Sequence, residues 1–254
     1  WDGDGRIDVL AGVSDWREYG WDDAYNEKGE WTRGPLHGYV WFHRNTGTNE
    51  QPVYAKPVKL EAGDQPLDQY GSPTPNPVDW FGSGKLDLIT GNFLDAVTAY
   101  RNTGAGSFAK GVPLTTADGK PIRLDLCMIQ ARTVYWRKGR GPSLLVGEED
   151  GTVSLFENSE PPGRAPKLAA GYYLQQVDPY VKSGALSRPA AVDWNGDGVI
   201  DLLAGNSAGY IQYFQNVGTA HSPMFVDRGY LEAGGKPIRR MAGPNGSVQR
   251  PAEA

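Results

Sequence analysis

The feature that most limits the possible folds is a short acidic loop that runs directly into an apolar segment. Residues 193–201 read DWNGDGVID and place oxygen-bearing side chains at loop positions 1, 3, 5 and 9. Hard cations such as Ca²⁺ take several oxygen ligands, and Gly198 stands where a tight turn needs positive φ. Position 12 is Ala204 instead of Glu, and the residues that follow are apolar. The stretch therefore predicts a cation loop that feeds a strand, which an EF-hand does not do.

This loop recurs, and the recurrence defines a repeat along the chain. A second marker follows each loop, a strand-like segment that ends in Asn, with Gly two residues later in three of the four copies. A third marker, RPAAV at 188–192, reappears as RPAEA at 250–254. Regular recurrence of such markers indicates stacked units of similar structure. A Trp stands at position 2 of every copy, at Trp1, Trp80, Trp136 and Trp194.

Each repeat has room for about four short strands, as expected for one blade of a β-propeller. In the fourth copy we expect strands near 189–194, 201–205, 210–216 and 224–231. We therefore expect an all-β chain that forms a single β-propeller domain over residues 1–254. The blade periods are approximately 1–78, 79–134, 135–192 and 193–254. We favour four blades of a larger propeller of about seven blades, and a closed ring of four is the alternative.

The Asp-x-Asp/Asn-x-Asp-Gly-x-x-Asp loops and the strand-turn repeats resemble the FG-GAP/VCBS repeat family, which includes the integrin α-subunit propeller. The resemblance covers nearly the whole chain and is strongest in the fourth copy. It implies a calcium-stabilised propeller that is secreted, periplasmic or on the cell surface. It does not imply one activity, because a fold of this kind carries many functions.

Composition argues against two classes of partner. The net charge is −5 and no block of Lys and Arg occurs, so we expect no nucleic-acid binding. No apolar run approaches the roughly 20 residues of a membrane span, so we expect none. Cys127 is the single cysteine, which excludes an internal disulfide.

The fourth loop is the best candidate for a calcium site, and the first loop is the next. Asp2, Asp4 and Asp8 occupy positions 3, 5 and 9 of the first loop, whose position 1 falls before Trp1. The second and third loops have lost ligands, for example at Phe81 and Arg137, and we expect no ion there. The role expected of Ca²⁺ is structural, coupling folding to metal binding. In the fourth loop the predicted ligands are the side chains of Asp193, Asn195, Asp197 and Asp201 and the carbonyl of Val199.

An aromatic insertion at residues 14–38 is the best candidate for function. It is about 20 residues longer than its counterparts, and long loops in compact repeats tend to be functional. Flat aromatic faces beside polar groups suit sugar rings, so we expect carbohydrate or glycan binding. Two alternatives are that the aromatic residues clamp the loop onto the domain, or that they contact another chain. The expected platform is Trp16, Tyr19, Trp21 and Trp31.

A catalytic alternative places an acid and a base in or beside the same insertion. The chain has a weaker similarity to propeller-type polysaccharide lyases that act on ulvan and related uronate glycans. That similarity implies a His and a Tyr as base and acid, with an Arg neutralising the uronate carboxylate. The candidates are His37, Tyr25, Tyr39 and Arg33. A third hypothesis is a structural or protein-interaction module of a cell-surface assembly, in which another chain or a missing segment completes the propeller.

Several other residues have structural interpretations. We interpret the Trp at position 2 of each loop as a core residue, because it recurs even where metal ligands are lost. Arg44 and Arg101, at equivalent turns, are expected to donate to backbone carbonyls. Two pairs of adjacent acids suggest a glycosidase acid pair, but side chains of neighbouring residues tend to diverge, and solvated surface is the better interpretation. These pairs are Asp22 with Asp23 and Glu148 with Glu149.

Overall fold

The computed structural model describes residues 1–20, 24–104, 107–176 and 180–240. These residues form strands, turns and loops, and no α-helical element occurs among them. Accordingly, no helix in these ranges has the length and apolar character needed to cross a membrane. The all-β class expected from the repeats is confirmed.

Sheet 1 carries the first loop at one end of its strands and the aromatic insertion at the other. Its strands are β1 (Val9–Asp15), β2 (His37–His43), β3 (Val58–Lys59) and β4 (Asp68–Tyr70). β2 pairs antiparallel with β1 on one side and with both β3 and β4 on the other. β1 is therefore an edge strand, and no described strand pairs with its outer edge.

Three further antiparallel sheets of four strands follow in chain order. Sheet 2 contains β5 (Asn76–Val78), β6 (Asp87–Gly91), β7 (Val97–Tyr100) and β10 (Val112–Pro113). Sheet 3 contains β11 (Gln130–Val134), β12 (Ser143–Gly147), β13 (Val153–Phe156) and β14 (Tyr172–Tyr173). Sheet 4 contains β15 (Arg188–Val192), β16 (Asp201–Gly205), β17 (Ile211–Asn216) and β18 (Phe225–Tyr230). The four strands expected in the fourth copy are thus confirmed, with ends that differ by one or two residues.

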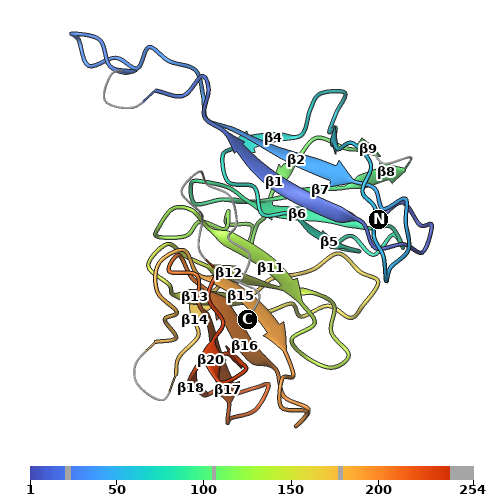
Figure 1. The fold of residues 1–254 in the computed structure, drawn as a ribbon, viewed down its shortest axis with the longest axis vertical. Coiled ribbons are helices and arrows are strands. Elements are labelled where there is room, and N and C mark those ends of the chain that lie inside the picture. The colour runs from blue at the N-terminus through green and yellow to red at the C-terminus, as the bar shows by residue number, and fades with distance from the viewer. Residues whose placement is uncertain (21–23, 105–106, 177–179, 241–254) are drawn as a thin grey trace.

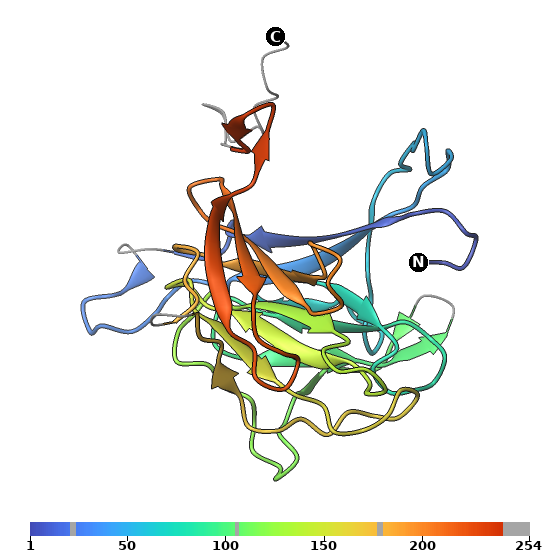
Figure 2. The same cartoon turned by 90° about the horizontal axis from the view of Figure 1, so that it is seen from below.

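Two small hairpins complete the described strands. They are β8 (Asn102–Gly104) with β9 (Ser107–Phe108), and β19 (Glu232–Ala233) with β20 (Lys236–Pro237). The larger sheets are stacked in series, from β1 and β2 at one end to β15–β18 at the other (Figure 1). The turned view shows the aromatic insertion and the C-terminal hairpin projecting from the stack (Figure 2). Buried clusters join each sheet to the next in the chain, and none of those in the described residues joins sheet 1 to sheet 4, so the stack is open.

The core lies between successive sheets because their central strands are buried on both faces. Side chains alternate along a strand, so neighbouring residues of β12 point to different sheets. Leu144 joins the cluster between sheets 2 and 3, whereas Leu145 joins the cluster between sheets 3 and 4. A third cluster, which includes Val40 and Leu88, lies between sheets 1 and 2. Each interface between sheets is therefore built from the two facing sides of adjacent units.

The loop Trp residues belong to these interfaces, with one exception. Trp80 and Trp136 are 3% and 2% exposed, and Trp1 stacks on Phe108 with 5.7 Å between ring centroids. Trp194 is 51% exposed. The core interpretation is therefore wrong for Trp194, because no described sheet packs on the outer side of sheet 4.

A repeated hydrogen bond links each loop to the Asn turn. The side chain at loop position 9 accepts the backbone N–H of the turn Asn at 2.7–3.0 Å in every repeat. The Asn side-chain oxygen in turn accepts the N–H two residues later. The Asn turns expected from the sequence are confirmed, and position 9 anchors them. The acceptor and donor pairs are Asp8–Asn45, Asp87–Asn102, Ser143–Asn158 and Asp201–Asn216.

Candidate functional sites

The base of the aromatic insertion packs onto the body of the molecule. Trp16 lies edge-on to Phe93, in the loop between β6 and β7, with 5.7 Å between centroids, and the rings of Tyr19 and Tyr70 of β4 lie 6.4 Å apart. Both Trp16 and Tyr19 are partly buried. These two members of the predicted platform therefore serve, at least in part, the clamping role that the sequence left as an alternative.

The outer part of the insertion presents aromatic surface to solvent. Tyr25 and Trp31 form a β-bridge, and their rings meet edge to face at 5.3 Å. Their exposed fractions are 58% and 38%. A tight turn between them is held by Asn26, whose side-chain oxygen accepts the N–H groups of Lys28 and Glu30. Trp21, the fourth residue of the predicted platform, lies outside the described residues, as do Asp22 and Asp23.

A cavity of about 470 Å³ opens beside this aromatic pair. It combines aromatic walls with one guanidinium, a mixture that suits a ligand with apolar faces and polar edges. Tyr19 and Trp31 lie 5.0 Å apart at this cavity, so the anchoring and the exposed aromatic residues are continuous. The lining residues are Tyr19, Tyr25, Trp31, Arg33, Pro35 and Tyr70.

His37, at the start of β2, is held by carboxylates. Its Nδ1 lies 2.5 Å from Oδ2 of Asp68, and its Nε2 lies 3.6 Å from a carboxylate oxygen of Glu18. Asp68 is oriented by the backbone N–H of Gly38, which donates to its other oxygen at 2.9 Å. The hydrogen bond to Asp68 raises the pKa of His37, although partial burial opposes this. His37 is therefore biased toward the protonated imidazolium.

Tyr39 stacks on His37 with 5.6 Å between ring centroids. Burial, together with the nearby Asp68 carboxylate, raises the pKa of Tyr39. The Nζ of Lys59 lies 3.2 Å from the centre of the Tyr39 ring, and both residues line a cavity of about 660 Å³. Trp16 and Arg17 line the same cavity.

The four residues proposed for lyase chemistry thus divide into two pairs. His37 and Tyr39 lie together on β2, whereas Tyr25 and Arg33 line the cavity beside Trp31. Tyr39 lines the cavity of about 660 Å³ instead. The sequence placed the four residues in or beside the insertion, and the structure divides them between these two places.

The fourth loop is organised by Asp193. Its Oδ1 accepts the backbone N–H groups of Gly196 and Asp197 at 2.8 and 3.0 Å, and its Oδ2 accepts that of Gly198 at 2.8 Å. The φ angle of Gly198 is 87°, which confirms the positive φ expected there. The Nδ2 of Asn195 donates to Oδ2 of Asp197 at 2.7 Å. The carboxylates are therefore held mainly by the loop's own N–H groups.

The fourth loop fits a hard cation by its donor chemistry. Asp193, Asp197 and Asp201 provide three carboxylates, and among the described residues none of them has an ion-pair partner. Asp201 is fully buried, and its Oδ2 accepts the hydroxyl of Tyr213 at 3.1 Å. In the described ranges, however, no three His, Cys, Asp or Glu side chains converge as they would around a metal ion. The loop therefore has the oxygen ligands that a hard cation needs, but in the described residues they do not point to one common centre.

The acids of the first loop already have cationic partners. Asp2 pairs with Nε of Arg44 at 2.7 Å, and Asp4 pairs with Arg6 at 2.6 Å. Hydrogen bonds from Arg6 lower the pKa of Asp4 to about 2. Asp8 accepts the backbone N–H of Asn45 at 2.7 Å. This loop fits a metal cation less well than the fourth, because Asp2 and Asp4 already have guanidinium partners.

Arg44 follows β2 and Arg101 follows β7, and both contact side chains in the loop of their own repeat. Arg44 pairs with Asp2, and the guanidinium of Arg101 lies 4.0 Å from the ring centre of Phe81. The expectation that both donate to backbone carbonyls is therefore wrong. The local sequence gave no sign of this, because each partner lies in the loop of the same repeat, some 20 to 42 residues earlier (101 − 81 = 20, 44 − 2 = 42).

Glu148 is a buried acid that the sequence did not reveal. It is fully buried, its Oε1 accepts the hydroxyl of Ser154 at 3.2 Å, and its Oε2 has no hydrogen-bond partner among the described residues. Burial raises its pKa. The solvated-surface interpretation is therefore wrong for Glu148. Its neighbour Glu149 accepts a hydrogen bond from the Cys127 thiol at 2.8 Å.

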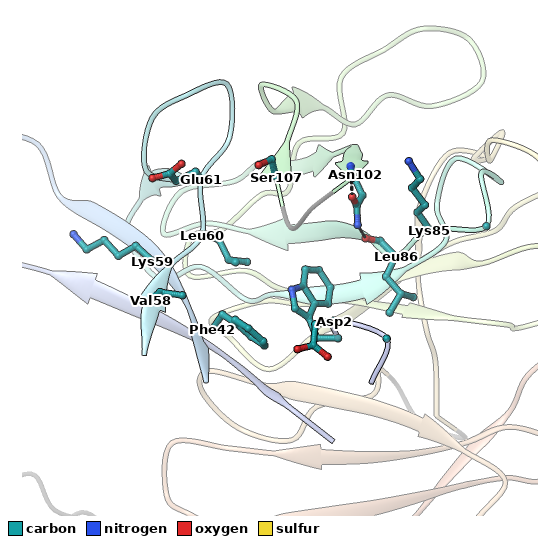
Figure 3. Close-up of a pocket in the computed structure, with 14 residues that line it drawn as sticks. Asp2, Phe42, Val58, Lys59, Leu60, Glu61, Lys85, Leu86, Asn102 and Ser107 are labelled. Atoms are coloured by element: carbon teal, nitrogen blue, oxygen red, sulfur yellow. Dashed lines mark hydrogen bonds between the residues drawn. The ribbon is translucent and has the colours of Figure 1, made fainter. Parts of the chain in front are cut away.

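A cavity of about 800 Å³ lies between sheets 1 and 2, on the side of the first loop. Phe42 and Leu60 form part of its apolar wall, while the charged ends of Lys59, Glu61 and Lys85 point away from it (Figure 3). It lies toward the first-loop end of β2, and Lys59 lines both this cavity and the one beside Trp16. No residue predicted for catalysis or sugar binding lines it.

Comparisons with known proteins give little guidance. No protein-family model matches the chain, and no curated protein matches it. Among solved structures, a chain of the Tc holotoxin pore of Photorhabdus luminescens is similar, with a TM-score of 0.34 and 14% sequence identity. The match covers 85% of this chain and 12% of that chain. We infer nothing about fold or function from a likeness of this size.

Proposed function

We propose that the four sheets are blades of a β-propeller of the FG-GAP/VCBS type, and that the chain binds a glycan on its aromatic insertion. The stacked four-stranded sheets and the repeated loop-to-Asn hydrogen bond support the propeller. A secreted, periplasmic or cell-surface location follows from the same resemblance and is part of the proposal.

The observation that carries the glycan proposal is the exposed pair of Tyr25 and Trp31. Burying such rings is favourable, so their exposure on a projecting hairpin indicates a surface kept for a partner. Sugar rings offer apolar C–H faces to aromatic side chains and hydroxyl groups to polar neighbours. Arg33 lines the cavity beside the pair and would supply hydrogen-bond donors.

The exposure of the outer rings supports a binding surface over the packing alternative. Trp16 and Tyr19 contact Phe93 and Tyr70, and these contacts already attach the insertion to the body. Tyr25 and Trp31 extend beyond the attachment and are the more exposed rings. A purely structural role would not require them to remain in water.

Calcium in the fourth loop is a further part of the proposal. Asp193, Asn195 and Asp197 would hold the ion, with the Val199 carbonyl, and Asp201 would close the loop against the Asn216 N–H. The ion would supply positive charge to carboxylates that lack a cationic partner in the described chain. Its effect would be on folding and loop rigidity, without a part in any reaction.

A lyase is the second candidate, and one observation favours it. His37, Tyr39 and Lys59 lie together, and a uronate carboxylate entering the adjacent cavity would meet the Lys59 ammonium. Because the hydrogen bond to Asp68 raises the pKa of His37, its neutral, basic form is disfavoured relative to that of a free imidazole. We therefore rank this function below glycan binding. Release of unsaturated sugars from uronate polymers, followed by ultraviolet absorbance, would support the lyase, and no release across the panel would exclude it.

The test of glycan binding is a glycan array, followed by calorimetric titration of the best monovalent ligand. Trp31→Ala and Tyr25→Ala should each weaken binding at least tenfold, equivalent to about 1.4 kcal/mol. Tyr54→Ala, which removes a 43%-exposed ring outside the insertion, should bind like the wild type. Unchanged affinity in both insertion variants would contradict the proposal.

A further inference from the structure

The fourth loop contains a dipeptide whose own atoms can react with each other. Asn195 is followed by Gly196, and no other Asn in the part of the chain that the structure describes precedes a Gly. The backbone nitrogen that follows an Asn can attack the side-chain amide, and glycine hinders this attack least because it has no Cβ. The same dipeptide at Asn245–Gly246 lies outside the described residues. The sequence therefore makes Asn195 a candidate for loss of its amide.

Three hydrogen bonds hold the reacting groups of this dipeptide. The attacking group is the N–H of Gly196, which donates to Oδ1 of Asp193 at 2.8 Å. The group that is attacked is the Asn195 amide, whose Oδ1 accepts the N–H of Asp197 at 3.0 Å. The leaving nitrogen, Nδ2 of Asn195, donates to Oδ2 of Asp197 at 2.7 Å. The nucleophile, the carbonyl oxygen and the leaving group are thus each held by a neighbour in the same loop.

Two of these contacts match what the reaction requires. A carboxylate that accepts an N–H can take its proton as the nitrogen attacks, which is the part of a general base. An N–H donor at the amide oxygen stabilises the negative charge that develops there in the tetrahedral intermediate. The Asp193 carboxylate and the Asp197 N–H occupy these two places. The fourth loop therefore carries a proton acceptor and an oxyanion donor for its own modification.

The dipeptide also has space around it and access to water. A Cβ added at Gly196 would meet no heavy atom within 4 Å, and both residues of the dipeptide are exposed. Asp2 and Gly3, the equivalent pair of the first loop, are exposed as well, although sheet 2 packs on sheet 1. The exposure of this pair therefore does not require sheet 4 to be the last sheet of the stack.

The first loop shows that an acid at position 3 fits this turn. Replacing Asn195 by Asp changes residues 194–198 from WNGDG to WDGDG, which is the sequence of residues 1–5. In the first loop, Oδ1 of Asp2 accepts the N–H of Asp4 at 3.2 Å. This is the same contact that Oδ1 of Asn195 makes two residues ahead, at 3.0 Å. The product of amide loss can therefore keep the turn that the amide makes.

We propose that Asn195 is a site of spontaneous covalent modification, at which the chain converts its own amide to aspartate and isoaspartate. The Gly196 nitrogen forms a bond to Cγ of Asn195 and gives its proton to Asp193. The bond between Cγ and Nδ2 breaks, and the departing nitrogen takes up one proton and leaves as ammonia. One water molecule then opens the resulting succinimide ring. Addition of water at Cγ gives aspartate, and addition at the backbone carbonyl gives isoaspartate.

The modification adds a negative charge at a position where the third strand of the unit offers no cation. In the first loop, Asp2 at position 3 pairs with Arg44 at 2.7 Å. The residue that corresponds to Arg44 in the fourth repeat is Gln215, which is neutral. The modified loop therefore has one more carboxylate without an ionic partner from that strand. This chemistry needs neither calcium nor a glycan, so it goes beyond the function proposed above and does not depend on it.

The test is peptide mapping by mass spectrometry during incubation of the full chain at neutral pH. A chelator keeps metal ions out of the loop, and fragmentation assigns each change from amide to acid to one residue. Asn195 should be modified at least tenfold faster than Asn206 and Asn216, which precede Ser and Val. A rate at Asn195 no higher than at these two residues would overturn the proposal.

The products distinguish ring closure from direct hydrolysis of the amide. Two products of equal mass should elute separately, and one of them should co-elute with the corresponding peptide of an Asn195→Asp variant. The other is the isoaspartate form, which only the ring intermediate can give. A single product that co-elutes with the Asn195→Asp peptide would contradict the proposed route.

An Asp193→Asn variant tests the proton acceptor. It keeps an oxygen that can accept the Gly196 N–H but lacks a basic carboxylate, so modification at Asn195 should slow about tenfold or more. Asp79→Asn is the matched control, because Asp79 accepts two N–H groups at position 1 of the second loop, and it should leave the rate at Asn195 unchanged. Thermal melting identifies the folded variants. A wild-type or faster rate in folded Asp193→Asn would refute the part assigned to Asp193, while the comparison within the wild type stands even if a variant fails to fold.

Discussion

The Arg137 guanidinium pairs with the Glu157 carboxylate in the third repeat, and its Nη2 donates to Oε1 at 2.8 Å. Arg137 is at loop position 3, and Glu157 immediately precedes the turn Asn. In the first repeat the same two positions hold Asp2 and Arg44, which pair at 2.7 Å with the charges exchanged. Two of the four repeats therefore hold an ion pair between these positions, with the acid and the base exchanged.

The other two repeats complete the comparison. In the second repeat these positions hold Phe81 and Arg101, in a cation–π contact. In the fourth they hold Asn195 and Gln215, which are both neutral, and Gln215 accepts from Arg228. The fourth loop is thus the acidic loop that lacks an ionic partner from its own third strand, which is the reason to expect an external cation there.

The ion pair of Arg137 and Glu157 should tolerate exchange of its two charges. Arg137→Asp or Glu157→Arg alone should destabilise the chain, because each leaves two like charges in contact. The double variant recreates the arrangement of Asp2 with Arg44 and should recover most of the loss. We expect a coupling of about 1–2 kcal/mol for a partly buried, hydrogen-bonded pair. Chemical denaturation of the four proteins measures it, and strict additivity would contradict the pairing.

Calcium should stabilise the chain through the fourth loop. At a calcium concentration 100 times the dissociation constant, linkage predicts about 2.7 kcal/mol of stabilisation, or roughly 5–10 °C in Tm. Asp193→Ala should abolish this increment. Asp4→Asn is the matched control in the first loop, where Arg6 already neutralises the acid, and it should retain the increment. A Tm that is identical in calcium and in chelator would rule out the site.

The His37–Asp68 contact predicts a pH-dependent stability. The pKa of His37 is raised in the folded chain above its ordinary value of 6.5, so the contact stabilises fully below about pH 6.5. This contribution is lost as the pH rises through the folded pKa. Proton NMR of the His37 ring should therefore titrate above 6.5, and Asp68→Asn should lower the midpoint. A midpoint at or below 6.5 in the wild type would refute the contact.

The raised pKa of Glu148 predicts how an uncharged substitute changes the stability of the chain. Its pKa is raised above the ordinary 4.5, so its contribution to stability is fully present below about pH 4.5 and is lost as the pH rises. Glu148→Gln keeps the shape of the side chain without ionising. The variant should therefore gain stability relative to the wild type between pH 4.5 and neutrality. Denaturation curves across that range measure the difference, and a pH-independent difference would show that Glu148 does not ionise there.

The repeats made the strands and the Asn turns predictable, because both depend on local alternation and on the hydrogen bonds of one side chain. The exposure of Trp194 and the burial of Glu148 were not predictable in this way. Trp194 has the same local sequence context as the buried Trp of other repeats, and only the absence of a described sheet beyond sheet 4 exposes it. Glu148 is buried in a turn, where sequence gives no burial signal.

The sequence predicted which segment carries the candidate site, but not which of its side chains lie together in space. Comparison of the repeats located the insertion at residues 14–38, and the structure divides its aromatic residues into attachment at Trp16 and Tyr19 and exposure at Tyr25 and Trp31. The acidic partner of His37, Asp68, comes from β4, 31 residues away in sequence. Pairing between β2 and β4 creates that contact, and no sequence motif indicates it.

The most direct test of glycan recognition is the indole N–H spectrum of the eight Trp residues during titration with the ligand found on the array. The indole of Trp31, which donates to the Gly34 carbonyl at 3.4 Å, should shift progressively and saturate with the binding isotherm. The indole of Trp194, at the far end of the sheet stack, should not follow that isotherm. A saturating shift at Trp194 with none at Trp31 would contradict the account.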